Sequence, residues 1–256
     1  MAKADMLLSK GEYFQASVAY ERVLYSCNDP LINYAAIKGK LSCLKQQQKF
    51  KEAVSFVASG RTLQLPDTLK CVLLYEEAVC SYLAGSFENT ISLSEELENV
   101  YPSYFGLGML QVITILSLNE LNRWQDASIY YTAFLQKYAL QNNNDTLPDL
   151  YKKIPKLKKE NTAQWLSTFL PGAGQMYAGK PLEGLVSILL QGAGVYYGIT
   201  SWQDGYYISA WLVGLGSFGS FHNGSVRRSE ILVHQYNRKK IIGFNQEVKK
   251  QLISLL

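Results

Sequence analysis

The stretch KGEYFQA, Lys10–Ala16, decides the fold of the first half of the chain, because it recurs three times at a fixed spacing. Its counterparts are QQKFKEA at 47–53, GSFENT at 85–90 and NRWQDA at 122–127. Each has an aromatic residue three positions before a small one, and both series advance by 37 residues: Tyr13, Phe50, Phe87 and Trp124, then Ala16, Ala53, Thr90 and Ala127. A constant period of this size is typical of repeat architectures.

The residues around these anchors predict two helices in each repeat. Leu7, Leu44 and Leu118 each lie six residues before the aromatic residue of their repeat, a helical spacing. We therefore expect a helix, a short turn and a second helix that the aromatic residue opens. One such pair cannot bury its own apolar face, so the pairs should stack into a solenoid. Cys43 and Cys80 occupy equivalent positions, which predicts a shared role in the core.

This pattern resembles the tetratricopeptide repeat (TPR), whose G-x-Y-x-x-A core is matched by GEYFQA, Gly11–Ala16. The resemblance covers residues 1–140 and implies about four helix pairs. The period of 37 exceeds the family's usual 34, so we expect the extra residues in turns. The first helix looks clipped at Met1, and we expect a longer precursor, with a signal peptide as one option.

The TPR resemblance also implies a groove for peptides or partner helices. The family's groove positions fall on two sets of residues, Lys38, Ser42 and Lys45 in the second repeat and Tyr75, Val79 and Tyr82 in the third. Family members that clamp a carboxylate have asparagines beside lysines, and Ser42 departs from that pattern. The alternative is that these six are ordinary solvated or inter-repeat residues.

Charge divides the chain into two environments. Residues 1–150 carry 12 Lys and Arg against 16 Asp and Glu, a net of −4, whereas residues 151–256 carry 13 against 5, a net of +8. Only Lys180, Glu183 and Asp204 are charged between positions 161 and 226. Such a gap in charge, next to five lysines between Lys152 and Lys159, indicates a lipid environment for the gap and a headgroup region for the lysines.

The low-charge region predicts a helical hairpin. Residues 182–202 can span a bilayer, and residues 206–222 come close to doing so. Trp202, Tyr206 and Tyr207 cluster at the turn, as an interfacial aromatic belt would. Small residues four apart, Gly194 with Gly198 and Ala210 with Gly214, permit close helix packing. Gln191 is expected to bond across the pair at mid-span.

The stretch before the hairpin, LPGAGQMYAGKPLEGL at 170–185, contains G-x-x-x-x-G-K but is not a phosphate loop. Pro181 follows the lysine, where a nucleotide site needs a hydroxyl for magnesium and a helix N-terminus with free N–H groups. The glycines are instead expected to let the backbone turn, with Pro181 opening the spanning helix. Tyr177 and Trp165 suit the membrane interface.

The same stretch resembles a small two-transmembrane-helix domain family whose hallmark is P-G-x-G-Q-x-Y-x-G. The hallmark maps to Pro171, Gly172, Gly174, Gln175, Tyr177 and Gly179 and covers residues 160–225. TPRs joined to such a hairpin look like envelope proteins of bacteria such as the Bacteroidetes. The resemblance therefore implies a bacterial inner-membrane location more than an activity.

The sequence carries no recognisable catalytic constellation. The cysteines Cys27, Cys43, Cys71 and Cys80 form no C-x-x-C pair, and the only histidines are His222 and His234, so we expect neither a metal site nor a cofactor. We expect small buried thiols instead. Neither a nucleic-acid partner nor a small-molecule substrate is expected.

An all-α organisation follows: a TPR-like solenoid at 1–140, a polar then basic linker at 141–160, a membrane hairpin at 161–225 and a basic amphipathic C-terminal helix at 226–256. Basic residues on both sides of the hairpin place its flanks in the cytoplasm, whereas a removed signal peptide would export the solenoid. The leading hypothesis is a non-enzymatic, membrane-anchored adaptor or scaffold. The alternatives are an oligomeric transport or channel component and a soluble TPR protein with a buried hairpin.

Overall fold

The computed structural model describes the chain except residues 60–64, 103–106, 143–149 and 256. The described residues form helices and no β-strand, so the predicted all-α class is confirmed. The chain divides into two compact units, Met1–Lys152 with Val248–Leu256, and Lys153–Glu247. Most of the polar half of the predicted linker falls on residues 143–149, outside the described part.

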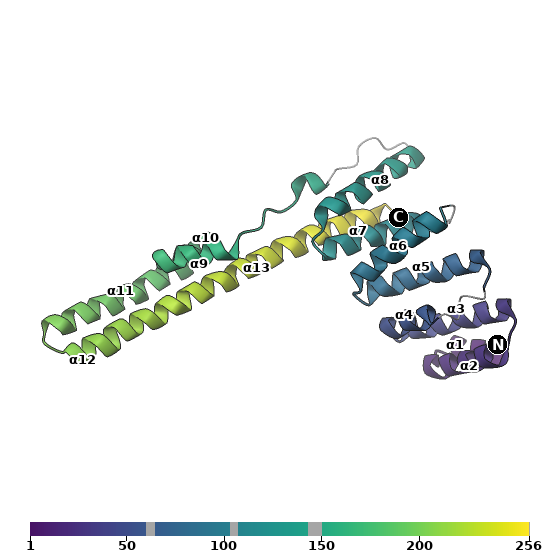
Figure 1. Cartoon of the computed structure of the whole chain (residues 1–256), viewed down its shortest axis with the longest axis horizontal. Helices are drawn as coiled ribbons and strands as arrows, with labels where there is room; N and C mark the ends of the chain where they lie inside the picture. The colour runs from purple at the N-terminus through teal and green to yellow at the C-terminus, as the bar shows by residue number, and fades with distance from the viewer. Residues whose placement is uncertain (60–64, 103–106, 143–149, 256) are drawn as a thin grey trace. The chain divides into compact units, whose positions relative to one another are not determined.

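The first unit contains four consecutive helix pairs (Figure 1), and each pair follows the repeat found in the sequence. The aromatic residue of every repeat is the first residue of its second helix, as predicted, and the small residue three positions later is fully buried. The pairs are α1 (Ala2–Ser9) with α2 (Tyr13–Ser26), α3 (Pro30–Gln46) with α4 (Phe50–Ala58), α5 (Asp67–Leu83) with α6 (Phe87–Val100), and α7 (Leu107–Glu120) with α8 (Trp124–Asn142).

All four turns inside the pairs have one geometry. The residue two positions before each aromatic is left-handed: Gly11 (φ 77°), Gln48 (57°), Gly85 (76°) and Asn122 (58°). The N–H that follows it donates to a carbonyl five residues earlier over 2.8 to 3.0 Å, as from Glu12 to Leu7. This is the Schellman ending of a helix, which favours glycine at the left-handed position. Two of the four turns therefore hold a residue that strains the backbone.

The core of the first unit combines small residues with a few large ones. Cys43 and Cys80 are both completely buried free thiols, in line with the core role predicted for them. Tyr20 is also buried, donates a 2.8 Å hydrogen bond from its hydroxyl to Asp5, and lies so close to Gly39 that a β-carbon there would meet its ring. Helix α3 begins at Pro30 behind an Asp29 cap that accepts from the N–H groups of Leu31 and Ile32.

The second unit lies after the short 3₁₀ turn η1 (Leu150–Lys153) and is built on a long hairpin (Figure 1). Its elements are α9 (Glu160–Phe169), α10 (Ala173–Tyr177), α11 (Pro181–Gln203), α12 (Tyr207–Ser209), the π-helical segment η2 (Ala210–Leu215) and the start of α13 (Gly216–Ser254). A small core of Ala163, Ala178, Leu232 and Val233 joins α9 and α10 to α13.

The structure bears on two further expectations for this unit. Within the described residues only α11 is long and apolar enough to cross a membrane by length and composition, so the structure does not support the expected pair of spans. The return arm is divided into α12, η2 and a 39-residue α13 whose second half is strongly charged. Residues 226–254 are helical, as expected of the basic C-terminal helix, but they continue α13 from the return arm without a break.

Candidate functional site

The turn between α9 and α10 is formed by a glycine in a crowded position. Gly172 is left-handed (φ 82°), and a β-carbon on it would lie 2.3 Å from the carbonyl oxygen of Gly184. Both the backbone angle and the contact with α11 therefore require glycine. Pro171 is half-buried directly before this turn.

The other two glycines of the hallmark serve different purposes. Gly179 is left-handed (φ 89°) and ends α10 with a Schellman turn in which the Lys180 N–H donates to the Gln175 carbonyl (2.9 Å), as expected for a turn residue. Gly174 is inside α10 with no positive φ, so its predicted role in turning the backbone is wrong. A β-carbon on Gly174 would lie 2.2 Å from Ser167 Oγ and 2.3 Å from the Ala163 carbonyl oxygen, so close packing on α9 requires it.

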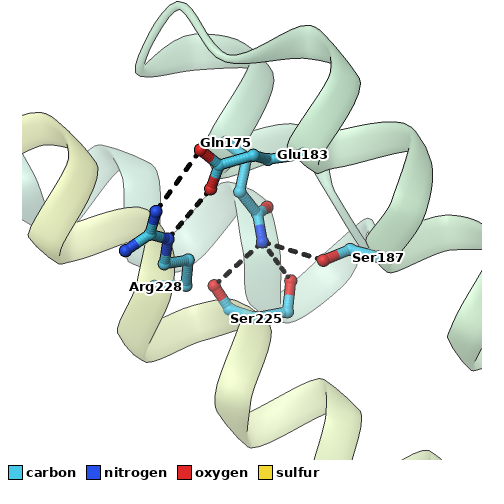
Figure 2. A network of polar contacts seen from close by, with 5 residues as sticks. All are labelled: Gln175, Glu183, Ser187, Ser225 and Arg228. Atoms are coloured by element: carbon cyan, nitrogen blue, oxygen red, sulfur yellow. Dashed lines mark hydrogen bonds and ion pairs between the residues drawn. The ribbon is translucent and has the colours of Figure 1, made fainter.

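Gln175 is the polar centre of the hallmark (Figure 2), and only 1% of it is exposed. Its Nε2 donates to Ser187 Oγ on α11 (3.0 Å) and to Ser225 Oγ on α13 (2.9 Å), with the Ser225 carbonyl oxygen at 3.3 Å. One side chain thus joins α10, α11 and α13. The Oε1 atom of Gln175 is buried without a partner among the described residues.

Other polar contacts close the same region. Arg228 on α13 binds Glu183 at the start of α11 through two hydrogen bonds, Nε to Oε2 at 2.9 Å and Nη2 to Oε1 at 3.3 Å (Figure 2). The Gly174 N–H donates to Ser167 Oγ (3.2 Å), and Ser229 Oγ donates to the Ala163 carbonyl (3.3 Å). These contacts thus join α9, α10, α11 and α13 within the unit.

Tyr177 joins α10 to the basic linker. It is half-buried, its carbonyl accepts from Lys158 Nζ (2.6 Å) and its hydroxyl accepts from the Lys159 N–H (3.2 Å). Trp165, by contrast, is 63% exposed and stacks on Phe169 with ring centroids 5.6 Å apart. Only Trp165 thus presents its ring outward.

The four small residues of the hairpin meet across its two arms. A β-carbon on Gly214 would lie 2.5 Å from the Gly198 Cα, and one on Gly194 would lie 2.8 Å from Ser217 Oγ. Ala210 is buried at the same junction, with its carbonyl oxygen 3.7 Å from the position of a Gly198 β-carbon. The arms therefore pack with their backbones in close contact.

Gln191 bonds across the hairpin, as predicted. Only 2% of it is exposed, and its Oε1 is 3.3 Å from Nδ1 of His222 on α13. Its Nε2 is buried and has no partner in the part of the chain that the structure describes. Gln191 also lines a hollow of about 470 Å³ whose other walls are mainly apolar.

The outer surface of the hairpin is apolar and uncovered. In the most apolar window of α11 only 17% is buried within the chain, so this chain by itself does not bury the hairpin. The residues at the tip, Trp202, Tyr206 and Tyr207, are each more than half exposed. Further exposed apolar residues on the two arms include Leu182, Val186, Leu189, Tyr196, Ile199, Ile208, Trp211, Leu212 and Leu215.

The six groove positions in the first unit do not form one open surface. Tyr75, Val79 and Tyr82 are half-buried and pack against the core between α5, α6 and α7. Lys45 donates to Glu76 (2.6 Å), Ser42 is half-buried, and Lys38 is exposed beside the ring of Tyr34. The tyrosines thus fit the inter-repeat alternative better than a free groove.

The G-x-x-x-x-G-K motif at Gly174–Lys180 does not adopt the geometry of a phosphate loop. Helix α10 has only five residues, and Lys180 is an exposed residue at the start of α11. The part of the chain that the structure describes contains no group of three His, Cys, Asp or Glu residues that could hold a metal. Burial, with the nearby carboxylate of Glu96, raises the pKa of Glu77 on α5 to about 7.

Comparison of the chain with models of protein families, with curated proteins and with solved structures found no match.

Proposed function

We propose that the chain is a non-enzymatic, membrane-anchored adaptor in which a TPR-like unit binds a partner protein or peptide and the hairpin holds the protein in a bilayer. The observation that carries the proposal is the apolar surface of α11, of which the most apolar window is only 17% buried in the chain. On a water-soluble protein, a continuous apolar helix surface such as this one would be covered by a partner. A bilayer covers it without one.

The dimensions of the hairpin support the anchor. The 23 residues of α11 extend about 34 Å at about 1.5 Å per residue, against a hydrocarbon core of about 30 Å. We propose that the return arm, from α12 to the start of α13, crosses back beside it. Trp202 and Tyr207 are in edge-to-face contact at the tip with centroids 4.8 Å apart, and exposed aromatic residues suit the headgroup boundary there.

The hallmark turn supports the same proposal. Leu170 and Pro171 line the same hollow as Ile188 and Gln191, so the end of α9 reaches beyond the first turn of the spanning helix. Irregular backbone at that depth is tolerated only where its polar groups are satisfied by protein. Within this turn the Gly174 N–H donates to Ser167 Oγ, and the N–H groups of Ala173 and Lys180 donate to the carbonyls of Leu170 and Gln175.

The adaptor role rests on the helix pairs of the first unit and on the TPR resemblance. Stacked helix pairs offer extended surfaces to peptides and partner helices. The setting that fits the resemblance is a bacterial envelope, with the protein in the inner membrane. The basic flanks favour a cytoplasmic solenoid, and removal of a signal peptide would instead place it in the periplasm.

Alkaline carbonate extraction of native membranes tests the anchor. We expect the protein to stay in the pellet, and its release into the soluble fraction would refute the anchor. Crosslinking in those membranes followed by mass spectrometry tests the adaptor role, for which we expect a recurrent protein partner attached to residues 1–140.

The unpartnered Nε2 of Gln191 favours a second candidate function, an oligomeric transport or channel component. At mid-span neither lipid tails nor bulk water supplies a hydrogen-bond acceptor for this Nε2. The acceptor would therefore come from a second copy of the hairpin. Mass photometry of the detergent-solubilised protein decides between the two. Oligomers that dissociate in Gln191→Leu support this candidate, and a monomeric wild-type protein excludes it.

A further inference from the structure

A hollow of about 810 Å³ lies between the linker after η1 and the middle of α13, within the second unit. Its size is in the range of small-molecule sites, about 300–1,000 Å³. The walls combine basic side chains with aromatic and other apolar surface. The lining residues are Lys153, Pro155, Lys156, Tyr236, Lys239, Lys240, Gly243, Phe244 and Glu247.

The hollow brings together two basic segments that are far apart in the chain. Two lysines come from the linker and two from α13, and all four are exposed. With Glu247 as the one acidic lining residue, the formal charge is four minus one, or +3. None of these four lysines forms an ion pair within the described residues. Glu247 offsets one of these charges, and a bound anion or counterions would relieve the remaining repulsion.

The linker wall of the hollow is held in place. The Asn237 side chain accepts from the Lys158 N–H (2.9 Å) and donates to the Lys158 carbonyl (2.8 Å), which fixes the linker along α13. The Lys158 Nζ lies 4.0 Å from the centre of the Tyr236 ring and donates to the Tyr177 carbonyl. A flexible basic tail would lose more conformational entropy on binding an anion than this preformed wall does.

We propose that this hollow binds a phosphate-bearing anion, with Lys153, Lys156, Lys239 and Lys240 as the cationic ligands. Lysine ammonium groups are compact point charges that suit phosphate oxygens. The proposal goes beyond the anchor, because it does not need α11 to span a membrane. The phosphate can belong to a lipid headgroup or to a soluble molecule.

Helix geometry separates those two sources. Tyr236 lies eight residues beyond Arg228, or about 12 Å along an α-helix, and Arg228 binds Glu183 at the start of the span. If α13 stands upright, the hollow lies beyond a headgroup layer of about 5–7 Å and meets soluble phosphates. If α13 tilts, lipid phosphates reach the hollow.

Isothermal titration calorimetry of the full chain tests the proposal, with pyrophosphate as the probe and phosphatidylcholine nanodiscs as the support. We expect saturable binding that weakens at least tenfold in Lys239→Gln/Lys240→Gln. The matched control is Lys249→Gln/Lys250→Gln, which removes the same charge from the same helix outside the hollow. Glu247→Gln should strengthen binding about two- to threefold, because it removes the one negative lining charge.

Repeating the titration in phosphatidylglycerol nanodiscs tests whether the bound phosphate belongs to a lipid headgroup or to a soluble molecule. Loss of pyrophosphate binding there assigns the hollow to a lipid phosphate, and unchanged binding assigns it to a soluble one. The proposal is overturned if pyrophosphate does not bind in phosphatidylcholine, or if both double variants weaken binding equally. Neither result bears on carbonate extraction, so this site and the anchor fail independently.

Discussion

Adding one methyl group to Gly172 should open the turn between α9 and α10. In Gly172→Ala the β-carbon would lie 2.3 Å from the Gly184 carbonyl oxygen and 2.9 Å from its carbon, on a backbone at φ 82°. The left-handed conformation costs an alanine about 1–2 kcal/mol. Overpacking against α11 adds about 1–3 kcal/mol. We therefore expect a local destabilisation of about 2–5 kcal/mol.

Two other glycines separate these contributions. Gly179 is also left-handed, but an added methyl group there would have only Lys158 Nζ nearby, at 3.9 Å. Gly179→Ala should therefore cost only the backbone contribution of about 1–2 kcal/mol. Gly192 is helical and has nothing within 4 Å, so Gly192→Ala should be neutral or slightly stabilising.

Hydrogen exchange with mass spectrometry of the full chain in detergent micelles measures the series. Peptides covering residues 160–180 should exchange roughly 30-fold faster or more in Gly172→Ala, since about 1.4 kcal/mol corresponds to a factor of ten. The effect in Gly179→Ala should be roughly 5- to 30-fold, with no acceleration in Gly192→Ala. If Gly172→Ala exchanges no faster than Gly179→Ala, the close contact with α11 does not exist and the reasoning is refuted.

Three further predictions concern other parts of the chain. Gln48→Gly should stabilise the first unit by about 1 kcal/mol by relieving a left-handed residue, whereas Gly85→Ala should destabilise it by a similar amount; equal signs in thermal melts would contradict the shared turn geometry. Because the pKa of Glu77 is raised to about 7, its contribution to stability is full below about pH 4.5 and falls as the pH rises to 7, by up to about 3 kcal/mol. Glu77→Gln should abolish this loss of stability when urea unfolding is measured at several pH values. A pH dependence of stability that is the same in wild type and Glu77→Gln would contradict the prediction. Asn237→Ala should speed amide exchange in residues 154–160 at least tenfold, because two hydrogen bonds to the linker are lost, and unchanged exchange would mean that the linker is held by other contacts.

Much of the first unit was predictable because its information is local and periodic. The spacing from Tyr13 to Ala16 marks both a helix start and a buried position, and the period of 37 repeats that signal three more times. The left-handed turns at Gln48 and Asn122 were not predicted, since neither is a glycine. The signal in the sequence was their position two residues before the aromatic residue of the repeat, which Gly11 and Gly85 occupy in the other two repeats.

The second unit shows where a sequence pattern stops being informative. The partners of Gln175 lie 12 and 50 residues away, and the contact between Lys158 and Asn237 spans 79 residues, so no local pattern marks them. The division of the chain at residue 226 followed its charge, but helical hydrogen bonding continues wherever the backbone allows it, and α13 passes through that position unbroken. Gly174 was assigned to a turn because glycine allows turning, whereas contact with α9 is what requires it.

The most direct test of the anchor compares two cysteines that are both accessible in the chain alone. Leu189 on α11 is 71% exposed and Tyr25 on α2 is 94% exposed. Leu189→Cys and Tyr25→Cys are made in a background where the four native cysteines are replaced, and opened native membranes are treated with a membrane-impermeant maleimide. We expect rapid labelling of Tyr25→Cys and almost none of Leu189→Cys, because the bilayer covers α11. Labelling of Leu189→Cys at the rate of Tyr25→Cys would contradict it.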